Sequence, residues 1–404
     1  MAVAPIGVSG LAMFVLALLA IMLGNGLNGA WPALRRSGIP PAVSGGLVFA
    51  AAAWASHAAI GVELAWPGEL RALLLLVFFA GLGLSAKFAG LAKGGVQVAI
   101  LCAVIAATIV AQNAAGAAIA RAFDQPAALG LFVGSIPFIG GHGTAAAWAQ
   151  APDAAHLPAR FEIGIAAATL GLVAGGLVGG PVAMWLSRLA RTGATPAAAG
   201  DPAFPDDEPD AGKSLSSLLS SDRWLFALLL IAAALAIGEG LQHLAVRQGL
   251  QLPAFLTAMF GGILITNAAD LVRRPVDHQL AELISTVALR LFLAMSMLSL
   301  KMWELIPYAG LLAVVLAVQV ALVVALSALV LFPLMGRDRD AAILSGGYIG
   351  FALGAMPIGL GTMRRLAESL GPAPRAFLVI TLAASLFTDT ANAIAIKAFF
   401  DRLG

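Results

Sequence analysis

Long apolar runs separated by short polar segments dominate the chain. Ten of them are long enough to cross a bilayer, which takes about 20 residues. Five lie in the first half, near 8–24, 41–60, 73–91, 96–122 and 161–186, and five in the second, near 224–245, 253–272, 280–302, 309–334 and 376–400. No basic region precedes the first run, so we interpret it as a span and not as a signal peptide. The pattern predicts an all-α polytopic membrane protein.

Two further segments are apolar but broken by glycine and proline. Residues 126–150 contain GSIPFIGGHGTAAAW, and residues 341–363 contain GGYIGFALGAMPIGLG. Irregular backbone at membrane depth is tolerated only where it is buried in protein or lines a wet cavity. Broken segments of this kind mark the binding sites of secondary transporters. We therefore predict that both segments are re-entrant hairpins.

The distribution of Lys and Arg predicts the orientation of the spans. Most of the 23 basic residues fall on one side if the N-terminus lies outside, and cytoplasmic segments carry the positive excess. Both termini are then periplasmic, the first hairpin enters from outside, and the second enters from the cytoplasm. Arg290 falls inside the eighth run, where a buried arginine would require an anionic partner.

A polar segment divides the chain into two similar halves. Residues 191–222 are rich in proline, acidic residues and serine, which predicts a disordered cytoplasmic linker. It separates a first repeat at 1–190 from a second at 223–404. The repeats share residues at an offset of 214: Phe78, Ala80, Leu84, Ser85 and Lys87 match Phe292, Ala294, Leu298, Ser299 and Lys301, and Gly140 matches Gly354. Five spans in each half predict two inverted repeats of five transmembrane helices, each with one re-entrant hairpin.

Composition excludes most other classes of protein. The chain is 60% hydrophobic and 11% charged, with a mean hydropathy of +0.95 and a net charge of +2, whereas soluble domains carry roughly 25% charged residues. The lipid bilayer is therefore its surroundings, and nothing indicates a nucleic-acid partner. A single cysteine, Cys102, cannot form an internal disulfide. The HExxH and GxSxG patterns are absent, so we predict a transporter without a cofactor and not an enzyme.

The first hairpin offers groups that could bind an anion. Gly140, Gly141 and Gly143 allow a sharp turn with exposed N–H groups, which form an anion-binding concavity. Ser135 and Thr144 add hydroxyl groups. His142 could contact the substrate, carry a proton or, as a neutral donor, hold the hairpin together. The alternative is that the glycines serve only close helix packing.

Polar residues in other spans could bind a cation. Asp389, deep in the last run, and Asn392 supply the oxygen ligands that Na⁺ requires. Gln112 and Asn113 in the fourth run could join them or bind the hairpin backbone instead. Arg290 could bind a substrate carboxylate, or could neutralise Glu282 or Asp389. A channel and a membrane-embedded enzyme using His142 and Asp389 remain the rival classes.

Several motifs in fixed order resemble the bacterial sodium/glutamate symporter family. They are GGHGTAAAW at 140–148, IPPAVSGGL at 39–47, VAQNAAG at 110–116, GLVAGGLVGGPVA at 171–183, LFLAM at 291–295, LKMWEL at 300–305 and GFALGAMP at 350–357. The resemblance implies a homodimer in the bacterial inner membrane that imports glutamate with Na⁺ by an elevator-like movement. It also implies a substrate site at the two hairpins, including Gly350 and Gly354.

Some positions depart from the family pattern. Met356 and Ile358 stand where the family has threonines, Ile139 replaces a serine, and Tyr348 replaces a histidine. Arg290 replaces a small neutral residue. These changes keep the fold and the transporter class. They add an alternative, which is a transporter of a more apolar organic anion coupled to Na⁺ or H⁺.

Overall fold

Helices make up almost all of the described chain in this computed structural model. It describes residues 6–32, 34, 39–86, 95–190, 221–248, 252–271 and 278–403. The predicted linker at 191–222 lies outside these residues, except for its last two, which begin α11. The only strands in the described part are β1 (Ile6–Gly7) and β2 (Leu64–Ala65), which pair in parallel.

Each of the ten predicted runs contains a helix. The first half has α1 (Gly10–Ala30), α3 (Pro41–Ile60), α4 (Glu69–Ser85), α6 (Gly95–Ala122) and α9 (Arg160–Arg188), with η1 (Ala127–Val133), α7 (Ser135–Phe138), α8 (Gly141–Ala149) and η2 (Pro152–Ala154) between the last two. The second half has α11 (Ser221–Arg247), α12 (Ala254–Leu271), α13 (His278–Leu298), η3 (Met302–Tyr308), α14 (Ala309–Leu326), η4 (Ser327–Leu331), α15 (Phe332–Leu334), α16 (Arg339–Leu370), α17 (Pro374–Ala383), η5 (Ala384–Thr388) and α18 (Asp389–Leu403).

Eight of the described helices or helical stretches are long and apolar enough to cross a membrane. The two remaining predicted spans do not form a single helix of that length. Helix α4 has 17 residues, which is slightly short. The last span consists of α17 and α18, joined by the five-residue π-helix η5. The chain is therefore a polytopic membrane protein, as the sequence predicted.

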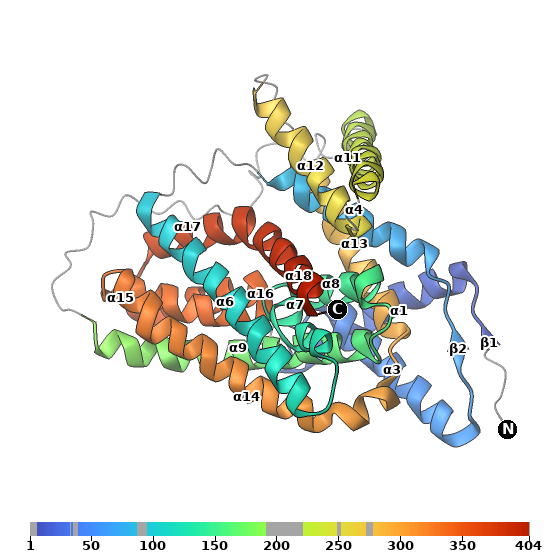
Figure 1. The fold of residues 1–404 in the computed structure, drawn as a ribbon, viewed down its shortest axis with the longest axis horizontal. Coiled ribbons are helices and arrows are strands. Elements are labelled where there is room, and N and C mark those ends of the chain that lie inside the picture. The colour runs from blue at the N-terminus through green and yellow to red at the C-terminus, as the bar shows by residue number, and fades with distance from the viewer. Residues whose placement is uncertain are drawn as a thin grey trace.

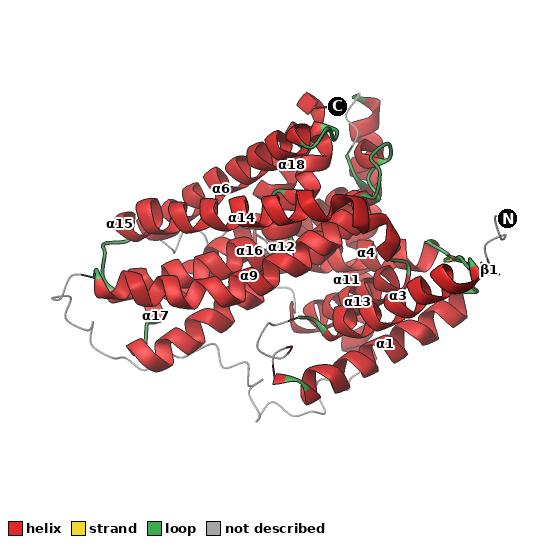
Figure 2. Cartoon of the chain, turned by 90° about the horizontal axis from the view of Figure 1, so that it is seen from below, coloured by secondary structure: helices red, strands yellow, loops and turns green. Residues whose placement is uncertain are grey.

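The helices form two bundles, and each bundle contains helices from both halves of the chain (Figures 1 and 2). Helices α1, α3 and α4 of the first half pack with α11, α12 and α13 of the second, and we call this group the six-helix bundle. Helices α6 and α9 pack with α14, α16, α17 and α18, and with the short elements between α6 and α9, in what we call the hairpin bundle. In both views the hairpin bundle lies toward the left, with α1 and α3 toward the right.

The first broken segment folds back on itself. The rings of Phe132, on η1, and of Trp148, on α8, both pack on the ring of Phe400, with centroids 6.4 Å and 5.5 Å away. A Cβ placed on Gly164 would lie 3.1 Å from Phe132 and 3.2 Å from Ala145. The first arm, formed by η1 and α7, therefore lies beside the second arm, formed by α8. We call residues 127–149 hairpin 1.

The second broken segment reverses within a continuous run of helical residues. A Cβ on Gly347 would lie 3.4 Å from the carbonyl oxygen of Gly359, although twelve residues of straight helix would span about 18 Å. A Cβ on Gly350 would lie 3.1 Å from the Cα of Gly359. Helix α16, which contains Pro357, therefore turns back near residue 355. We call it hairpin 2.

Small residues let hairpin 2 pack closely against α9. Gly171, Gly175 and Gly179 stand at four-residue intervals, so they share one face of α9. A Cβ on these residues would lie 2.3 Å from the Leu353 oxygen, 3.0 Å from the Gly350 oxygen and 2.6 Å from the Gly346 oxygen, respectively. Backbone therefore meets backbone along this contact, as small-residue helix interfaces in membranes allow.

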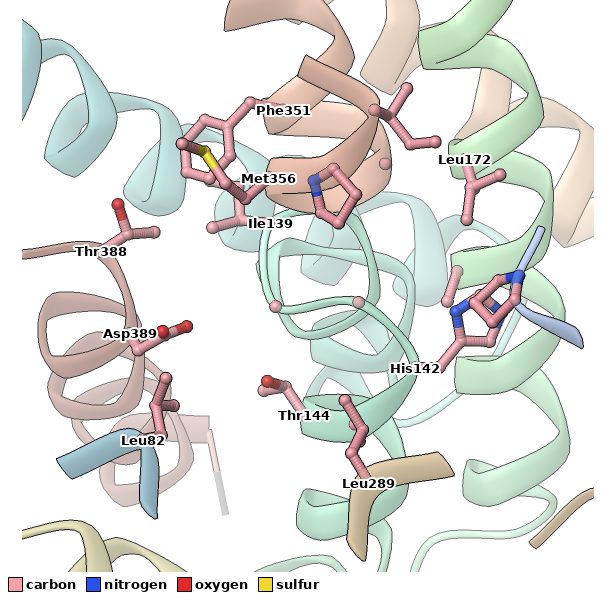
Figure 3. Close-up of a pocket in the computed structure, with 18 of the residues that line it drawn as sticks. Leu82, Ile139, His142, Thr144, Leu172, Leu289, Phe351, Met356, Thr388 and Asp389 are labelled. Atoms are coloured by element: carbon pink, nitrogen blue, oxygen red, sulfur yellow. The ribbon is translucent and has the colours of Figure 1, made fainter. Parts of the chain in front are cut away.

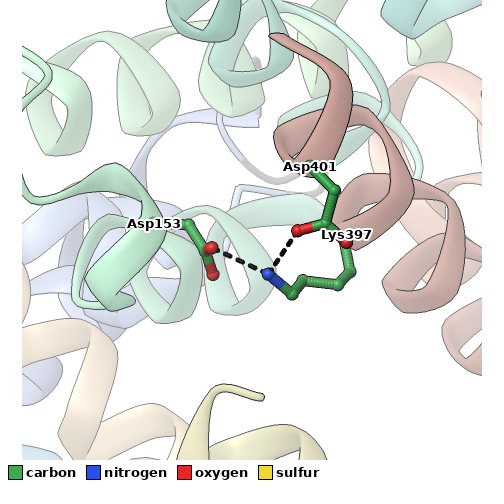
Figure 4. Close-up of polar contacts among 3 residues, drawn as sticks. All are labelled: Asp153, Lys397 and Asp401. Carbon is green, nitrogen blue, oxygen red and sulfur yellow. Dashed lines mark hydrogen bonds and ion pairs between the residues drawn. The ribbon is translucent and has the colours of Figure 1, made fainter. Parts of the chain in front are cut away.

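An ion pair connects α18 to the loop after hairpin 1. The Lys397 Nζ lies 2.9 Å from Asp153 Oδ1 and 2.6 Å from Asp401 Oδ1 (Figure 4). Lys397 and Asp153 are mostly buried, whereas Asp401 is exposed. The contact fixes the end of the last helix against the segment that follows the first hairpin.

Candidate functional site

A cavity of about 390 Å³ lies where the tips of the two hairpins meet the six-helix bundle. Hairpin 1 contributes residues 139–144, and hairpin 2 contributes Phe351, Gly354 and residues 356–358. The opposite wall comes from the six-helix bundle through Phe78, Leu82 and Leu289, among others. Segments from both halves of the chain thus build one site (Figure 3).

The tip of hairpin 1 presents the beginning of a helix to this cavity. Gly141 starts α8 with φ of 69°, in the left-handed region that glycine tolerates best. No side chain caps this helix, and the first N–H groups of a helix have no intrahelical acceptor. Gly140, Gly143 and Thr144 line the cavity beside it. This tip can therefore donate hydrogen bonds to an anion.

His142 lines the cavity and also ties hairpin 1 to α9. Its Nε2 lies 3.0 Å from Thr169 Oγ1, whose own hydroxyl donates to the Ile165 carbonyl at 2.9 Å. The imidazole must therefore donate from Nε2. The histidine is 6% exposed, and this geometry fits the role of a structural donor.

Asp389 reaches the cavity from the start of α18, directly after the π-helix η5. Figure 3 shows its carboxylate across the cavity from Thr144, with Thr388 on the same side. The Thr388 hydroxyl donates to the Ala383 carbonyl at 3.3 Å, so its lone pairs remain available to a cation. Among the described residues that line the cavity, Asp389 is the only carboxylate and none is Lys or Arg.

Behind the cavity, buried amide side chains hold the first arm of hairpin 1. The Ser135 N–H donates to Asn113 Oδ1 at 2.9 Å, and the Ser135 hydroxyl donates to Asn392 Oδ1 at 2.6 Å. Asn392 Nδ2 donates to the Ser135 carbonyl at 3.3 Å. Ser135, Asn113 and Asn392 are each at most 1% exposed. Gln112 Nε2 donates to the Ala352 carbonyl of hairpin 2 at 3.0 Å.

The predicted site residues thus fall into three groups. Gly140, Gly141, His142, Gly143, Thr144, Gly354 and Asp389 line the cavity. Ser135, Gln112, Asn113 and Asn392 bind hairpin backbone or one another behind it, and Gly350 packs against Gly359 within hairpin 2. The third group is Arg290 alone. The expectation that Arg290 is buried is wrong, because its side chain is exposed and lies outside the cavity lining.

Sequence reasoning missed two kinds of residue. The apolar wall of Phe78, Leu289 and Phe351 carries no signal of its own in so hydrophobic a chain. Gln319 does carry one: it is a lone amide in an apolar run, like Gln112, and its Nε2 donates to backbone carbonyls of both Gln112 and Val133 at 3.0 Å. The signal that identified Gln112 could have identified it too.

Comparison with known proteins covers nearly the whole chain. A family model described as "Sodium/glutamate symporter" matches residues 6–372. The chain is similar to the sodium/glutamate symporters of Escherichia coli (strain K12) and Shigella flexneri, each 35% identical over 399 residues and 96% of both chains. It is 34% identical to that of Haemophilus influenzae over 387 residues, 95% of both chains. Since the family model spans most of the chain and these relatives are matched over almost their full length, the chain belongs to the sodium/glutamate symporters.

Proposed function

We propose that this protein is a Na⁺-coupled symporter that imports glutamate or a related small anionic amino acid. The observation that carries the proposal is the shared cavity, where hairpin tips from both halves of the chain converge. Membership of the sodium/glutamate symporter family supports the same reaction. A transporter moves its solute without covalent chemistry, so no cofactor is required.

The substrate's carboxylates bind at the hairpin tips in this proposal. The uncapped start of α8 faces the cavity, and the positive end of a helix dipole favours an anion there. Thr144 adds a hydroxyl donor beside it, and the backbone near Gly354 approaches from hairpin 2. Since no Lys or Arg lines the described cavity, the N–H groups and the coupling ion supply the positive charge.

Na⁺ binds beside Asp389. The Asp389 carboxylate and the Thr388 hydroxyl oxygen lie on one side of the cavity, and carbonyl oxygens of the hairpin tips could complete the coordination. Asn392, Asn113 and Gln112 stand behind this position and fix the hairpins that enclose it. A bound cation would neutralise Asp389 and make the cavity acceptable to an anion.

The two bundles suggest how the site alternates between the two sides of the membrane. The hairpin bundle carries both tips, α9 and α18, while the six-helix bundle presents the apolar residues Phe78, Leu82 and Leu289 to them. An elevator-like mechanism would move the hairpin bundle along this apolar wall. The proposal includes inverted repeats at 1–190 and 223–404, re-entrant hairpins from opposite sides, periplasmic termini, a cytoplasmic linker and a homodimer.

A more apolar organic anion is the alternative substrate. Ile139, Met356 and Ile358 all line the cavity near the hairpin tips, where they replace polar residues of the family pattern. They would favour a solute with more apolar surface than glutamate, coupled to Na⁺ or H⁺.

Uptake by the full chain in proteoliposomes tests these proposals. A Na⁺ gradient should drive accumulation of labelled glutamate, and unlabelled glutamate should compete better than longer apolar carboxylates. Asp389→Asn should raise the Na⁺ concentration for half-maximal uptake roughly tenfold or more, since a contact to a charged group is worth about 1.5–3 kcal/mol. Asp401→Asn, which changes an exposed carboxylate on the same helix, is the matched control.

Each failure in that assay has a distinct meaning. Accumulation driven only by a proton gradient would exclude Na⁺ coupling. Equilibration without accumulation would indicate a channel, and chemical conversion of the solute would indicate an enzyme. Normal Na⁺ activation in Asp389→Asn would remove Asp389 from the cation site.

A further inference from the structure

Gln319 on α14 forms hydrogen bonds to two other elements of the hairpin bundle, although it lies outside the cavity. The side chain is fully buried, and it does not line the cavity. Its Nε2 donates two hydrogen bonds, both 3.0 Å long, to backbone carbonyls of other elements. One acceptor is Gln112, on α6. The other is Val133, at the end of η1 in hairpin 1.

The Val133 carbonyl needs this donor because η1 ends at this residue. Gly134 follows with φ of −113° and ψ of −138°, so the helical hydrogen-bond ladder is broken there and the last carbonyl of η1 has no helical N–H ahead of it. A buried carbonyl without a donor is costly. Gln319 supplies the missing donor from a different helix, and so holds hairpin 1 at the break between η1 and α7.

Gln112 holds hairpin 2 in a corresponding way. Its Nε2 donates to the Ala352 carbonyl, which lies just before the point near residue 355 where hairpin 2 turns back. Helix α6 from the first half thus binds the hairpin of the second half, and α14 from the second half binds the hairpin of the first. The hydrogen bond from Gln319 to the Gln112 carbonyl also joins α14 directly to α6.

The orientation of both amides follows from these bonds. Rotating either amide by 180° would place its oxygen against backbone carbonyl oxygens, so the nitrogens must face the hairpins. The Oε1 atoms of Gln112 and Gln319 are left buried without a hydrogen-bond donor among the described residues. Both side chains therefore leave one polar atom unsatisfied while they hold the hairpins.

We propose that Gln319 is a positioning residue of the transport site. It fixes the break between η1 and α7 of hairpin 1 relative to α6 and, through Gln112, relative to hairpin 2, so that the two tips close on the cavity together. The inference rests on the proposed function, because it gives a residue that touches neither ion nor substrate a role in their joint binding. The affected property is the coupling between hairpins and not the chemistry of either tip.

Removing the amides should weaken Na⁺ and glutamate binding together. In proteoliposomes, Gln319→Leu and Gln112→Leu should each raise the half-maximal concentrations of both solutes by roughly tenfold, the effect of losing about 1.4 kcal/mol. The double variant should be little worse than the poorer single variant, because both act in one network. Thr257→Val, a buried hydroxyl change in the six-helix bundle, should behave like the parent.

A second readout does not depend on transport. In a Cys102→Ser background, Met356→Cys places a thiol at the tip of hairpin 2. Gln319→Leu should increase its rate of reaction with a soluble thiol reagent severalfold, although Gln319 contacts hairpin 1. If the parent shows no Na⁺-driven uptake, the proposed function fails, and this labelling rate still decides the role of Gln319.

Gln319→Glu separates a specific hydrogen bond from general packing. A protonated glutamic acid can donate one hydrogen bond to Val133 or Gln112, whereas the ionised form donates none. Burial raises the pKa of a carboxyl group above its ordinary value of about 4.3, so relative to the parent this variant should work better at about pH 5 than at about pH 8. It remains informative if Gln319→Leu does not fold. Parent-like constants in Gln319→Leu, additive effects in the double variant, unchanged labelling, or a Gln319→Glu variant as impaired at about pH 5 as Gln319→Leu would each overturn the proposal.

Discussion

Gly171 is the position where one added methyl group should disturb both hairpins at once. An alanine Cβ there would lie 2.3 Å from the Leu353 oxygen of hairpin 2 and 2.5 Å from a ring carbon of Phe138 in hairpin 1. Ordinary contact begins near 3.4 Å, so one or both hairpins must move by about 1 Å. The contact with Leu353 is to backbone, which cannot rotate away.

The expected cost of Gly171→Ala follows from two opposing effects. Overpacking a well-filled interior costs about 1–3 kcal/mol, while alanine is intrinsically better than glycine in a helix by about 0.5–1 kcal/mol. Overpacking dominates because backbone stands in the way. We therefore expect a lower thermal unfolding temperature in detergent, and Na⁺-driven glutamate uptake reduced roughly tenfold.

Gly176→Ala is the matched control for that measurement. It lies five residues further along α9, and an alanine Cβ there would meet only Ile358, at an ordinary 3.9 Å. This variant should keep the parent's uptake and melt at the same temperature or slightly higher. If Gly171→Ala and Gly176→Ala were indistinguishable in uptake and stability, the close contact between α9 and the hairpins would not matter for transport.

Two further predictions concern an exposed ion pair and the topology. Lys301 lies 2.6 Å from Glu63 and lowers the pKa of that carboxyl below its usual 4.5, so their ion pair should stabilise the fold above that pH and be lost on acidification. Since both side chains are about 40% exposed, Glu63→Gln should lower the free energy of unfolding by less than about 1 kcal/mol at neutral pH and leave it unchanged in strong acid. A large drop in the thermal unfolding temperature at neutral pH would refute this. In a Cys102→Ser background, Pro126→Cys should react with an impermeant thiol reagent from outside and Arg364→Cys only from the cytoplasm; labelling of both from one side would refute the inverted repeats.

The sequence predicted what depends on composition along the chain. Apolar runs located the helices, and clusters of glycine and proline located both segments that reach the cavity. It could not place Arg290, because a hydropathy count gives depth along a helix and not the side that faces a cavity. Leu289 and Leu293 line the cavity, and the next residue after Leu289 points about 100° away around the helix.

The sequence also could not predict contacts between residues that are far apart along the chain. Ser135 and Asn392 are separated by 257 positions, yet they share two hydrogen bonds. The sequence suggested Asn392 and Asn113 as cation ligands or backbone partners, and only the fold reveals which donors already occupy their oxygens. The six-helix bundle contains three helices from each half of the chain, and this arrangement likewise depends on packing that no local sequence pattern encodes.

The π-helix before Asp389 separates the two ends of the last span. Hydrogen bonds in a π-helix close over five residues instead of the four of an α-helix, so this segment acts as one inserted residue and rotates α18 by about 100° relative to a continuous helix from α17. Helix α17 can then pack on α6 and α16 while α18 independently turns Asp389 toward the cavity. Deleting a single residue from 384–387 would keep Thr388 and Asp389 in the chain and still aim the carboxylate elsewhere. The phase of this helix, as much as its composition, decides whether the site carries a charge.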